Sequence, residues 1–257
     1  MSDDKRLRMP DDPYCYPNTN VLINKLNIRN VEQLAKMEVA FTSLALQELY
    51  RFPIEGNYDF DHLCKFNEHI FKDIYEWAGH QRMTAIVKSE DILQNDTIEY
   101  AHALDVRREV NAVLKEMNSR EWEKMSLDEQ ATHLSSDMAK LWRVHPFREG
   151  NTRTTIAFTC QFAESKGMFM DRNIFAKHAE TTRSTLVLAS SKEGIKSPHA
   201  LCALVKLSLE EGLEKHQNQQ QKMSMGGWKS IISKMKDNIN SKKGESNTKT
   251  KNTRDER

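Results

Sequence analysis

Residues 145–154 of the chain read His-Pro-Phe-Arg-Glu-Gly-Asn-Thr-Arg-Thr and lie just before a segment with helical periodicity. The stretch gathers a base, a carboxylate, a glycine, an amide and two arginines, a combination that core packing does not require. An imidazole accepts a proton, a carboxylate holds a divalent cation, and backbone amides at a helix N-terminus bind anions. The stretch therefore predicts a phosphate-binding loop that carries its own base.

Each of these groups taken alone has a more common structural explanation. A single His is usually a hydrogen-bonded structural residue, and a Gly-Asn pair is usually a turn. An exposed Glu–Arg pair contributes under about 1 kcal/mol to stability. The prediction depends on finding all of the groups within one short loop.

The same stretch resembles the active-site signature of the Fic-domain family, whose members are protein AMP transferases. The matching positions are His145, Pro146, Phe147, Glu149, Gly150, Asn151 and Arg153. Two further segments resemble the family: Tyr-Glu-Trp-Ala-Gly at 75–79 precedes the place of its target-aligning flap, and Tyr-Pro-Asn-Thr-Asn at 16–20 resembles its entry segment. The resemblance covers residues 14–212 and implies an all-α, mainly helical Fic fold with a short β-hairpin flap.

Two positions depart from the family pattern. Thr152 stands where the family usually has a second glycine, and threonine is less free to adopt a positive φ. Ile156 stands where many members have a second arginine, which binds the terminal phosphate or an inhibitory glutamate. The resemblance therefore assigns no residue of this chain to either role of that arginine.

The resemblance implies catalytic roles for His145 and Glu149 that agree with their chemistry. A neutral imidazole with a pKa near about 6.5 accepts a proton at cellular pH without special tuning, which suits His145 as the general base. Magnesium is commonly held by one or two carboxylates and by substrate phosphates, which suits Glu149 as the metal ligand. The expected cofactor is Mg²⁺, with ATP as the substrate.

The resemblance also implies that the loop binds the nucleotide through Gly150, Asn151, Thr152 and Arg153. Amide donors at Asn151 and around Gly150 suit the oxygens of the α-phosphate, where negative charge builds during transfer. The fork-shaped guanidinium of Arg153 suits the β-phosphate. Phe147 is the large apolar residue of the loop, and we expect it to plug the core.

The acceptor side of the site is expected in residues 84–88. In Fic proteins a β-hairpin flap holds the target segment by strand addition, and Ile86 and Val87 occupy the corresponding place. The sequence Thr-Ala-Ile-Val-Lys favours a strand at this point. An ordinary edge strand explains the same residues equally well.

Fic proteins are commonly restrained by a glutamate in a Ser/Thr-x-x-x-Glu-Gly/Asn motif, carried in the chain or on a small antitoxin protein. Glu55 precedes Gly-Asn, but Arg51 takes the place of Ser or Thr, and Pro53 disfavours a helix. Glu211 precedes a glycine, but Leu207 takes the first position. We therefore expect either a partner-supplied restraint or weak intrinsic inhibition.

The composition of the chain excludes several classes of protein. Its 257 residues carry a formal charge of +1, which argues against non-specific electrostatic binding of nucleic acid. The chain lacks an apolar run of about 18 residues, and its charged first residues do not form a secretory signal. The 4 scattered cysteines predict free thiols. We expect a cytoplasmic protein or a secreted or translocated effector.

Apolar residues at three- and four-residue spacings predict a series of helices. One stripe comprises Val31, Leu34, Ala35, Val39, Leu44, Ala45 and Leu49, and a second comprises Leu63, Phe66, Ile70, Phe71 and Ile74. Further helices are expected over 97–117, after a Ser-Leu-Asp-Glu capping box at 126–129, from about Thr152 to Gly167, and after Ser197-Pro198.

The predicted organisation is a tail at 1–13, a Fic domain at 14–212 and a polar extension at 213–257. Apolar residues of the extension predict one short amphipathic helix at 228–239 that docks on the domain or on a second copy rather than on a membrane. These residues are Trp228, Ile231, Ile232, Met235 and Ile239. Residues 241–257 have the composition of a disordered tail.

The sequence thus predicts a protein adenylyltransferase that transfers AMP from Mg-ATP to a Ser, Thr or Tyr hydroxyl of a target protein, itself included. The expected partners are that target, an inhibitory antitoxin-like protein and a second copy of the chain, with no nucleic acid and no membrane. The alternative is a nucleotide-binding or protein-interaction module of the same fold, weakened through Thr152 and Ile156. The presence of both His145 and Glu149 favours the enzyme.

Overall fold

The structure is a computed structural model that describes residues 12–88, 90–93, 97–191 and 199–222. The chain divides into two compact units, residues 1–212 and 213–257, which are considered separately. The described part of the second unit, residues 213–222, is helical. Within the described ranges, no helix is both long and apolar enough to cross a membrane.

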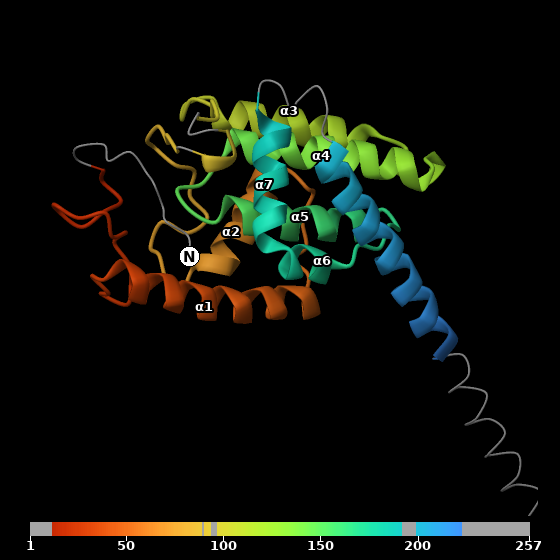
Figure 1. Ribbon diagram of the computed structural model, residues 1–257, viewed down its shortest axis with the longest axis horizontal. Helices are drawn as coiled ribbons and strands as arrows, with labels where there is room; N and C mark the ends of the chain where they lie inside the picture. The colour runs from red at the N-terminus through yellow and green to blue at the C-terminus, as the bar shows by residue number, and fades with distance from the viewer. Residues whose placement is uncertain (1–11, 89, 94–96, 192–198, 223–257) are drawn as a thin grey trace, which may run out of the picture. The chain divides into compact units, whose positions relative to one another are not determined.

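The first unit is mainly helical, which confirms the predicted fold class (Figure 1). Its elements are α1 (Val31–Arg51), α2 (Phe60–Phe71), η1 (Asp91–Leu93), α3 (Val106–Ser119), η2 (Trp122–Lys124), α4 (Leu127–Val144), α5 (Asn151–Ser165), α6 (Arg172–Lys177) and α7 (Ala179–Ser190). Residues 199–212 add a further helical segment.

Helices α2 and α5 lie in the middle of the first unit, with α1 on one side and the pair α3 and α4 on the other (Figure 1). Helix α1 packs against α2, and α2 packs against α5. Helix α4 packs against both α5 and α7. The loop between α4 and α5 therefore joins two helices that also pack against each other, which fixes both of its ends.

Side chains cap helices α4 and α2. Ser126 and Glu129 form the predicted capping box at the start of α4. Asp59 accepts a hydrogen bond from the backbone N–H of His62 at 2.8 Å and so caps α2. Helix α5 ends near Gly167, whose φ of 77° supplies the left-handed stop that the sequence predicts.

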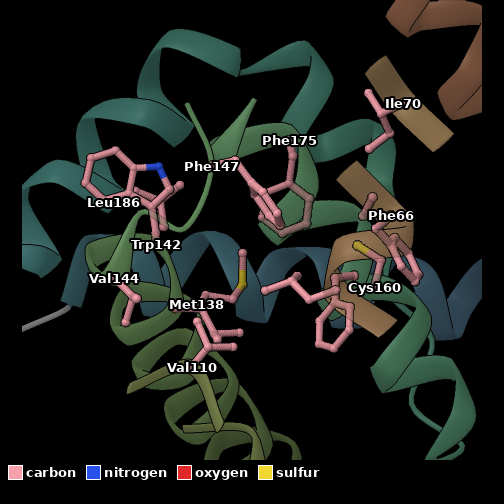
Figure 2. Close-up of a cluster of buried hydrophobic side chains, with 14 of the residues drawn as sticks. Phe66, Ile70, Val110, Met138, Trp142, Val144, Phe147, Cys160, Phe175 and Leu186 are labelled. Atoms are coloured by element: carbon pink, nitrogen blue, oxygen red, sulfur yellow. The ribbon is translucent and has the colours of Figure 1, made fainter. Parts of the chain in front are cut away.

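Aromatic side chains fill the core around the loop. Figure 2 shows Phe147 among the buried side chains contributed by α2, α4 and α5. Phe147, Phe66 and Phe158 are fully buried. The predicted apolar stripe that runs from Leu63 in α2 to Ile74 just after it is buried as well. The expectation that Phe147 anchors the loop to the core is confirmed.

The inward face of α1 differs from the predicted stripe. Val31, Val39 and Leu44 are 43%, 63% and 68% exposed, so the assignment of these residues to the core is wrong. Glu38 and Thr42 lie on the inward face and form hydrogen bonds with Arg153 there. The spacing of apolar residues does not predict an inward helix face that buries polar side chains in pairs.

Helix α3 begins at Val106, and the expectation of a helix from residue 97 is wrong. The carbonyl of Ala101 accepts a hydrogen bond from Arg82, and the carbonyl of Ala103 accepts one from Gln81 at 2.6 Å. These side chains hold residues 101–103 in a non-helical connection, and Arg82 joins it to the loop that follows α4.

The predicted hairpin is reduced to isolated bridges in the described residues. Ile86 and Val87 lie in a loop, whereas Lys88 and Thr97 each form a single bridge. Residues 89 and 94–96 lie outside the described residues.

Three further expectations concern segments that the structure does not describe. The helix start at Ser197-Pro198 falls outside the described residues, although the helix itself is present from residue 199. The amphipathic helix at 228–239 and the tail at 241–257 also lie outside them. The predicted domain boundaries at residues 14 and 212 stay predictions.

Candidate active site

His145 ends α4 in a left-handed conformation, with φ of 52° and ψ of 59°. Its backbone N–H donates to the carbonyl of Trp142 at 3.1 Å, which closes the last turn of the helix. Few residues other than glycine adopt this conformation, and His, Asn and Asp are the most tolerant of it. The reversal of the chain places the imidazole against the end of α4 and directs Pro146 and Phe147 into the loop.

The two ring nitrogens of His145 have different surroundings. Nδ1 lies 3.1 Å from the carbonyl oxygen of Trp142, and because a carbonyl only accepts, Nδ1 carries the proton. Nε2 therefore holds the lone pair, and it is buried without a hydrogen-bond partner in the described part of the chain. A buried, unpartnered acceptor is uncommon, so Nε2 is a place where an O–H donor could bind.

His145 is only 3% exposed, and the ring of Tyr100 packs against its imidazole with 4.2 Å between the ring centroids. Burial lowers the pKa of His145 well below its usual value of 6.5, and the nearby charge of Lys88 lowers it further. The expectation of an untuned pKa is therefore wrong. The sequence could not reveal this shift, because both the ring of Tyr100 and the charge of Lys88 come from outside the loop.

The buried histidine predicts a loss of stability in acid. On unfolding, the pKa of His145 returns to about 6.5, so below that pH the unfolded chain binds a proton that the folded chain does not. Stability must then fall as the pH is lowered through 6.5, with a limiting slope of about 1.4 kcal/mol per pH unit for one proton.

Thermal unfolding between pH 7.5 and pH 5.5 tests this prediction. We expect the midpoint to fall with acidification in the native chain and to fall less in His145→Asn. Burial also lowers the pKa of His62, so part of the decrease should remain in the variant. Equal decreases in both proteins would show that His145 is not a source of the acid sensitivity.

Glu149 places one carboxylate at the mouth of the loop. Its Oε1 accepts the backbone N–H of Gly150 at 3.0 Å and lies 4.0 Å from Nη2 of Arg153. The described residues contain no cluster of three or more His, Cys, Asp or Glu side chains that could hold a metal, so Glu149 offers a single carboxylate. This donor set fits Mg²⁺, which takes one or two carboxylates and completes its shell with phosphates and water.

Helix α5 opens directly at this carboxylate. Gly150 is its N-cap, with φ of 78° and ψ of 13°, and no described side chain caps the helix there. The first N–H groups of a helix lack partners within the helix, and its dipole is positive at this end. The start of α5 is therefore suited to a phosphate group.

The side chains of Asn151 and Thr152 hold the loop in shape. Asn151 both accepts from the N–H of Phe147 at 2.9 Å and donates to its carbonyl at 2.7 Å. Thr152 accepts a hydrogen bond from Nε1 of Trp142 at 2.9 Å and is part of α5, so it needs no positive φ. These residues can meet an anion through their backbone N–H groups.

Arg153 projects from the first turn of α5 toward α1. Its Nη1 donates to Oγ1 of Thr42 at 2.9 Å, and its Nη2 forms an ion pair with Glu38. Its guanidinium also lies over the ring of Phe71, 4.7 Å from the centroid. Sequence reasoning missed Glu38 and Thr42, because α1 carries many other polar residues and nothing in the sequence marks these two.

Asn67 joins three segments beneath the loop. Its Nδ2 donates to the carbonyl of Glu149 at 3.2 Å and to Oγ1 of Thr154 at 3.1 Å. Its Oδ1 accepts the N–H of Gly79 at 2.9 Å. Asn67 was also missed, and its signal was an amide within the apolar stripe of α2.

Arg82 supports the opposite side of the loop. Its Nε donates to the carbonyl of His145 at 2.7 Å, and its backbone N–H donates to the carbonyl of Pro146 at 2.9 Å. A buried cation at the end of α4 also meets the negative end of the helix dipole. Ile86 and Val87 follow Arg82 in the chain, so the segment expected to dock the target lies just after a residue that touches the loop between α4 and α5.

Comparison with known proteins identifies this arrangement. A model of the Fic/DOC family matches residues 57–163. A probable protein adenylyltransferase, y4lH of Sinorhizobium fredii, is 30% identical over 171 residues, which are 65% of this chain and 83% of that protein. The chain belongs to the Fic/DOC family.

Another protein adenylyltransferase resembles a larger part of the chain. Protein adenylyltransferase VbhT of Bartonella schoenbuchensis is 32% identical over 203 residues, which are 78% of this chain. The chain spans 40% of the length of that relative.

Solved Fic domains show the same fold. The Fic domain of the VirB-translocated effector Bep8 from Bartonella sp. 1-1C superposes with a TM-score of 0.66 at 20% identity, covering 78% of this chain and 96% of that one. A Fic domain from Bartonella quintana with bound ADP also gives a TM-score of 0.66 at 20% identity, covering 78% of this chain and 95% of that one.

Proposed function

We propose that the chain is a protein adenylyltransferase that transfers AMP from Mg-ATP to a Ser, Thr or Tyr hydroxyl of a target protein, itself included. The observation that carries the proposal is the unpartnered Nε2 of His145, in the loop that leads into the uncapped start of α5. The names of two relatives, protein adenylyltransferase VbhT and probable protein adenylyltransferase y4lH, support it.

In this proposal the loop binds the nucleotide mainly through its backbone. The N–H groups of residues 151–153 and the dipole of α5 hold the oxygens of the α-phosphate. The guanidinium of Arg153 contacts the β-phosphate. Glu149 would hold Mg²⁺, which would supply positive charge beside the phosphates.

His145 then acts on the incoming hydroxyl. The hydroxyl donates its hydrogen bond to Nε2, its oxygen attacks the α-phosphorus, and its proton passes to Nε2. The bond from the α-phosphorus to the bridging oxygen breaks, and pyrophosphate leaves. The lowered pKa keeps the ring neutral at pH 7, and the Trp142 carbonyl stabilises the imidazolium through Nδ1–H.

The target segment is proposed to dock beside residues 84–88. Val87 is exposed, and the backbone of Ile86 and Val87 belongs to neither a helix nor a regular strand of the described residues. An added target strand would complete hydrogen bonds there without requiring one side-chain sequence. Because Arg82 joins this loop to His145, a segment bound here would bring its hydroxyl toward Nε2.

Restraint of the activity is proposed to come from a partner protein. Glu55 is exposed in a non-helical segment, as Pro53 predicts, and Ile156 offers no charge to any inhibitory glutamate. Glu55→Gly and Glu211→Gly are therefore expected to leave the rate of AMP transfer by the isolated chain unchanged. The alternative of a weakened binding module is not favoured, because His145 and Glu149 are both held in the loop.

Labelled ATP tests the proposal directly. We expect the chain to transfer label to protein in a cell lysate from ATP labelled at the α-phosphate and to transfer none from ATP labelled at the γ-phosphate. The γ-labelled reaction is the control, because a phosphotransferase would give the opposite result. Tight ATP binding with no transfer to any protein would support the binding module instead.

A further inference from the structure

Arg153 is held by three groups that lie outside its own helix. Thr42 and Glu38 on α1 contact its two terminal nitrogens, and the ring of Phe71 lies against its guanidinium plane. Its side chain is 29% exposed, and that of Glu38 is 15% exposed. An arginine with this exposure and these partners has one preferred orientation.

Glu38 is itself fixed at both of its oxygens. Oε1 pairs with Arg153, and Oε2 accepts a 2.6 Å hydrogen bond from the hydroxyl of Tyr75. Tyr75 is buried and stacks on Trp77, with 4.3 Å between centroids and 15° between planes. The carboxylate is therefore a rigid link between α1, the segment after α2, and α5.

We propose that Glu38 is a positioning residue that, together with Thr42, aims Arg153 at the β-phosphate of the nucleotide. The inference rests on the proposed function, which assigns that phosphate to Arg153. It adds that α1, which lies outside the signature, sets the affinity for nucleotides that carry a β-phosphate.

The donor inventory of the guanidinium supports this role. Arginine has five N–H donors in a planar fork, and α1 engages one at each terminal nitrogen. The remaining donors stay available to a phosphate. Arginine also carries about 2 kcal/mol of rotamer entropy, and a side chain that is already ordered loses less of it on binding.

An opposite role for Glu38 is distinguishable. A carboxylate that competed with phosphate for Arg153 would weaken nucleotide binding, so its removal would tighten binding. A carboxylate that orients Arg153 strengthens binding, so its removal weakens binding. The sign of the change in affinity therefore decides between the two roles.

The experiment measures the affinities of Mg-ATP, Mg-ADP and AMP for the native chain and for Glu38→Ala by calorimetry. We expect ATP and ADP to bind about tenfold more weakly to the variant, because a charge-assisted contact is lost. We expect AMP, which lacks a β-phosphate, to bind equally to both. Equal weakening for all three nucleotides would indicate a merely structural role, and tighter ATP binding would indicate competition; either result overturns the proposal.

Arg153→Ala and the double variant separate this inference from the proposed function. If Arg153→Ala leaves ATP binding unchanged, the assignment of the β-phosphate fails. If it weakens ATP but Glu38→Ala does not, only the positioning role fails. In the Arg153→Ala background, we expect Glu38→Ala to have no further effect.

Two more variants address unfolding of Glu38→Ala and a non-specific effect of changing α1. Glu38→Gln keeps the shape of the side chain and an acceptor for Tyr75, so it decides the question should Glu38→Ala unfold. Glu48→Ala removes an exposed carboxylate from the same helix and should leave all three affinities unchanged. A loss of ATP affinity in Glu48→Ala as large as that in Glu38→Ala would mean that any change in α1 has this effect, which overturns the proposal.

Discussion

Replacing His145 with Asn is expected to lower the rate of AMP transfer by roughly 10²–10⁴-fold. Asn tolerates the left-handed φ of 52° at this position better than Ala does, so the loop should keep its shape. An amide cannot take a proton at neutral pH, so the hydroxyl would have to attack without a base. Nucleotide binding should persist, because residues 151–153 and Glu149 are unchanged.

Single-turnover transfer from α-labelled ATP, with nucleotide affinity measured in parallel, checks this expectation. His178→Asn makes the same chemical change at an exposed ring at the start of α7, and it should retain the native rate. A His145→Asn variant that keeps a tenth or more of the native rate would exclude His145 as the general base. A variant that also loses nucleotide binding would mean that the loop had collapsed.

The loop could be predicted from the sequence because its chemistry is contiguous. Few sites other than a phosphate site need a base, a carboxylate and a helix start within ten residues. Phe147, the large apolar residue among them, indicated that the loop is anchored in the core. Helices α2 and α4 could be predicted because apolar residues form their inward faces and a capping box marks where α4 begins. In these segments the local pattern and the tertiary packing agree.

The surroundings of the loop could not be predicted in the same way. The pKa of His145 depends on Tyr100 and Lys88, and its carbonyl is held by Arg82, which is 63 positions away in the chain. Arg153 pairs with Glu38, 115 positions away. Periodicity reports which face of a helix is apolar, but it does not reveal which polar groups on distant segments will meet.

Replacing Gly150 with Ala is expected to disrupt the site through Phe71. A Cβ at Gly150 would lie 2.0 Å from Cε2 and 2.2 Å from Cζ of Phe71, a ring that is fully buried and cannot swing away. The φ of 78° adds strain for any residue with a Cβ. Together the overlap and the strain should destabilise the chain by about 2–5 kcal/mol.

Transfer should fall as well in Gly150→Ala, by about 10²-fold even at temperatures where the variant is folded. Phe71 supports the guanidinium of Arg153, and Gly150 begins the row of backbone N–H groups at the start of α5. A displacement of the ring therefore moves both parts of the proposed phosphate site, and a shift of about 1 Å is enough for a loss of this size.

Gly167→Ala is the matched control, because Gly167 has nearly the same φ, 77°, and no described atom lies within 4 Å of the position that an added methyl group would take. Its cost should be the backbone strain alone, about 1–2 kcal/mol, with transfer unchanged. Chemical denaturation of both variants isolates the contribution of the overlap as the difference between them. If the two variants are equally stable, Phe71 yields at little cost, and the close approach of α2 to the loop does not hold the site in shape.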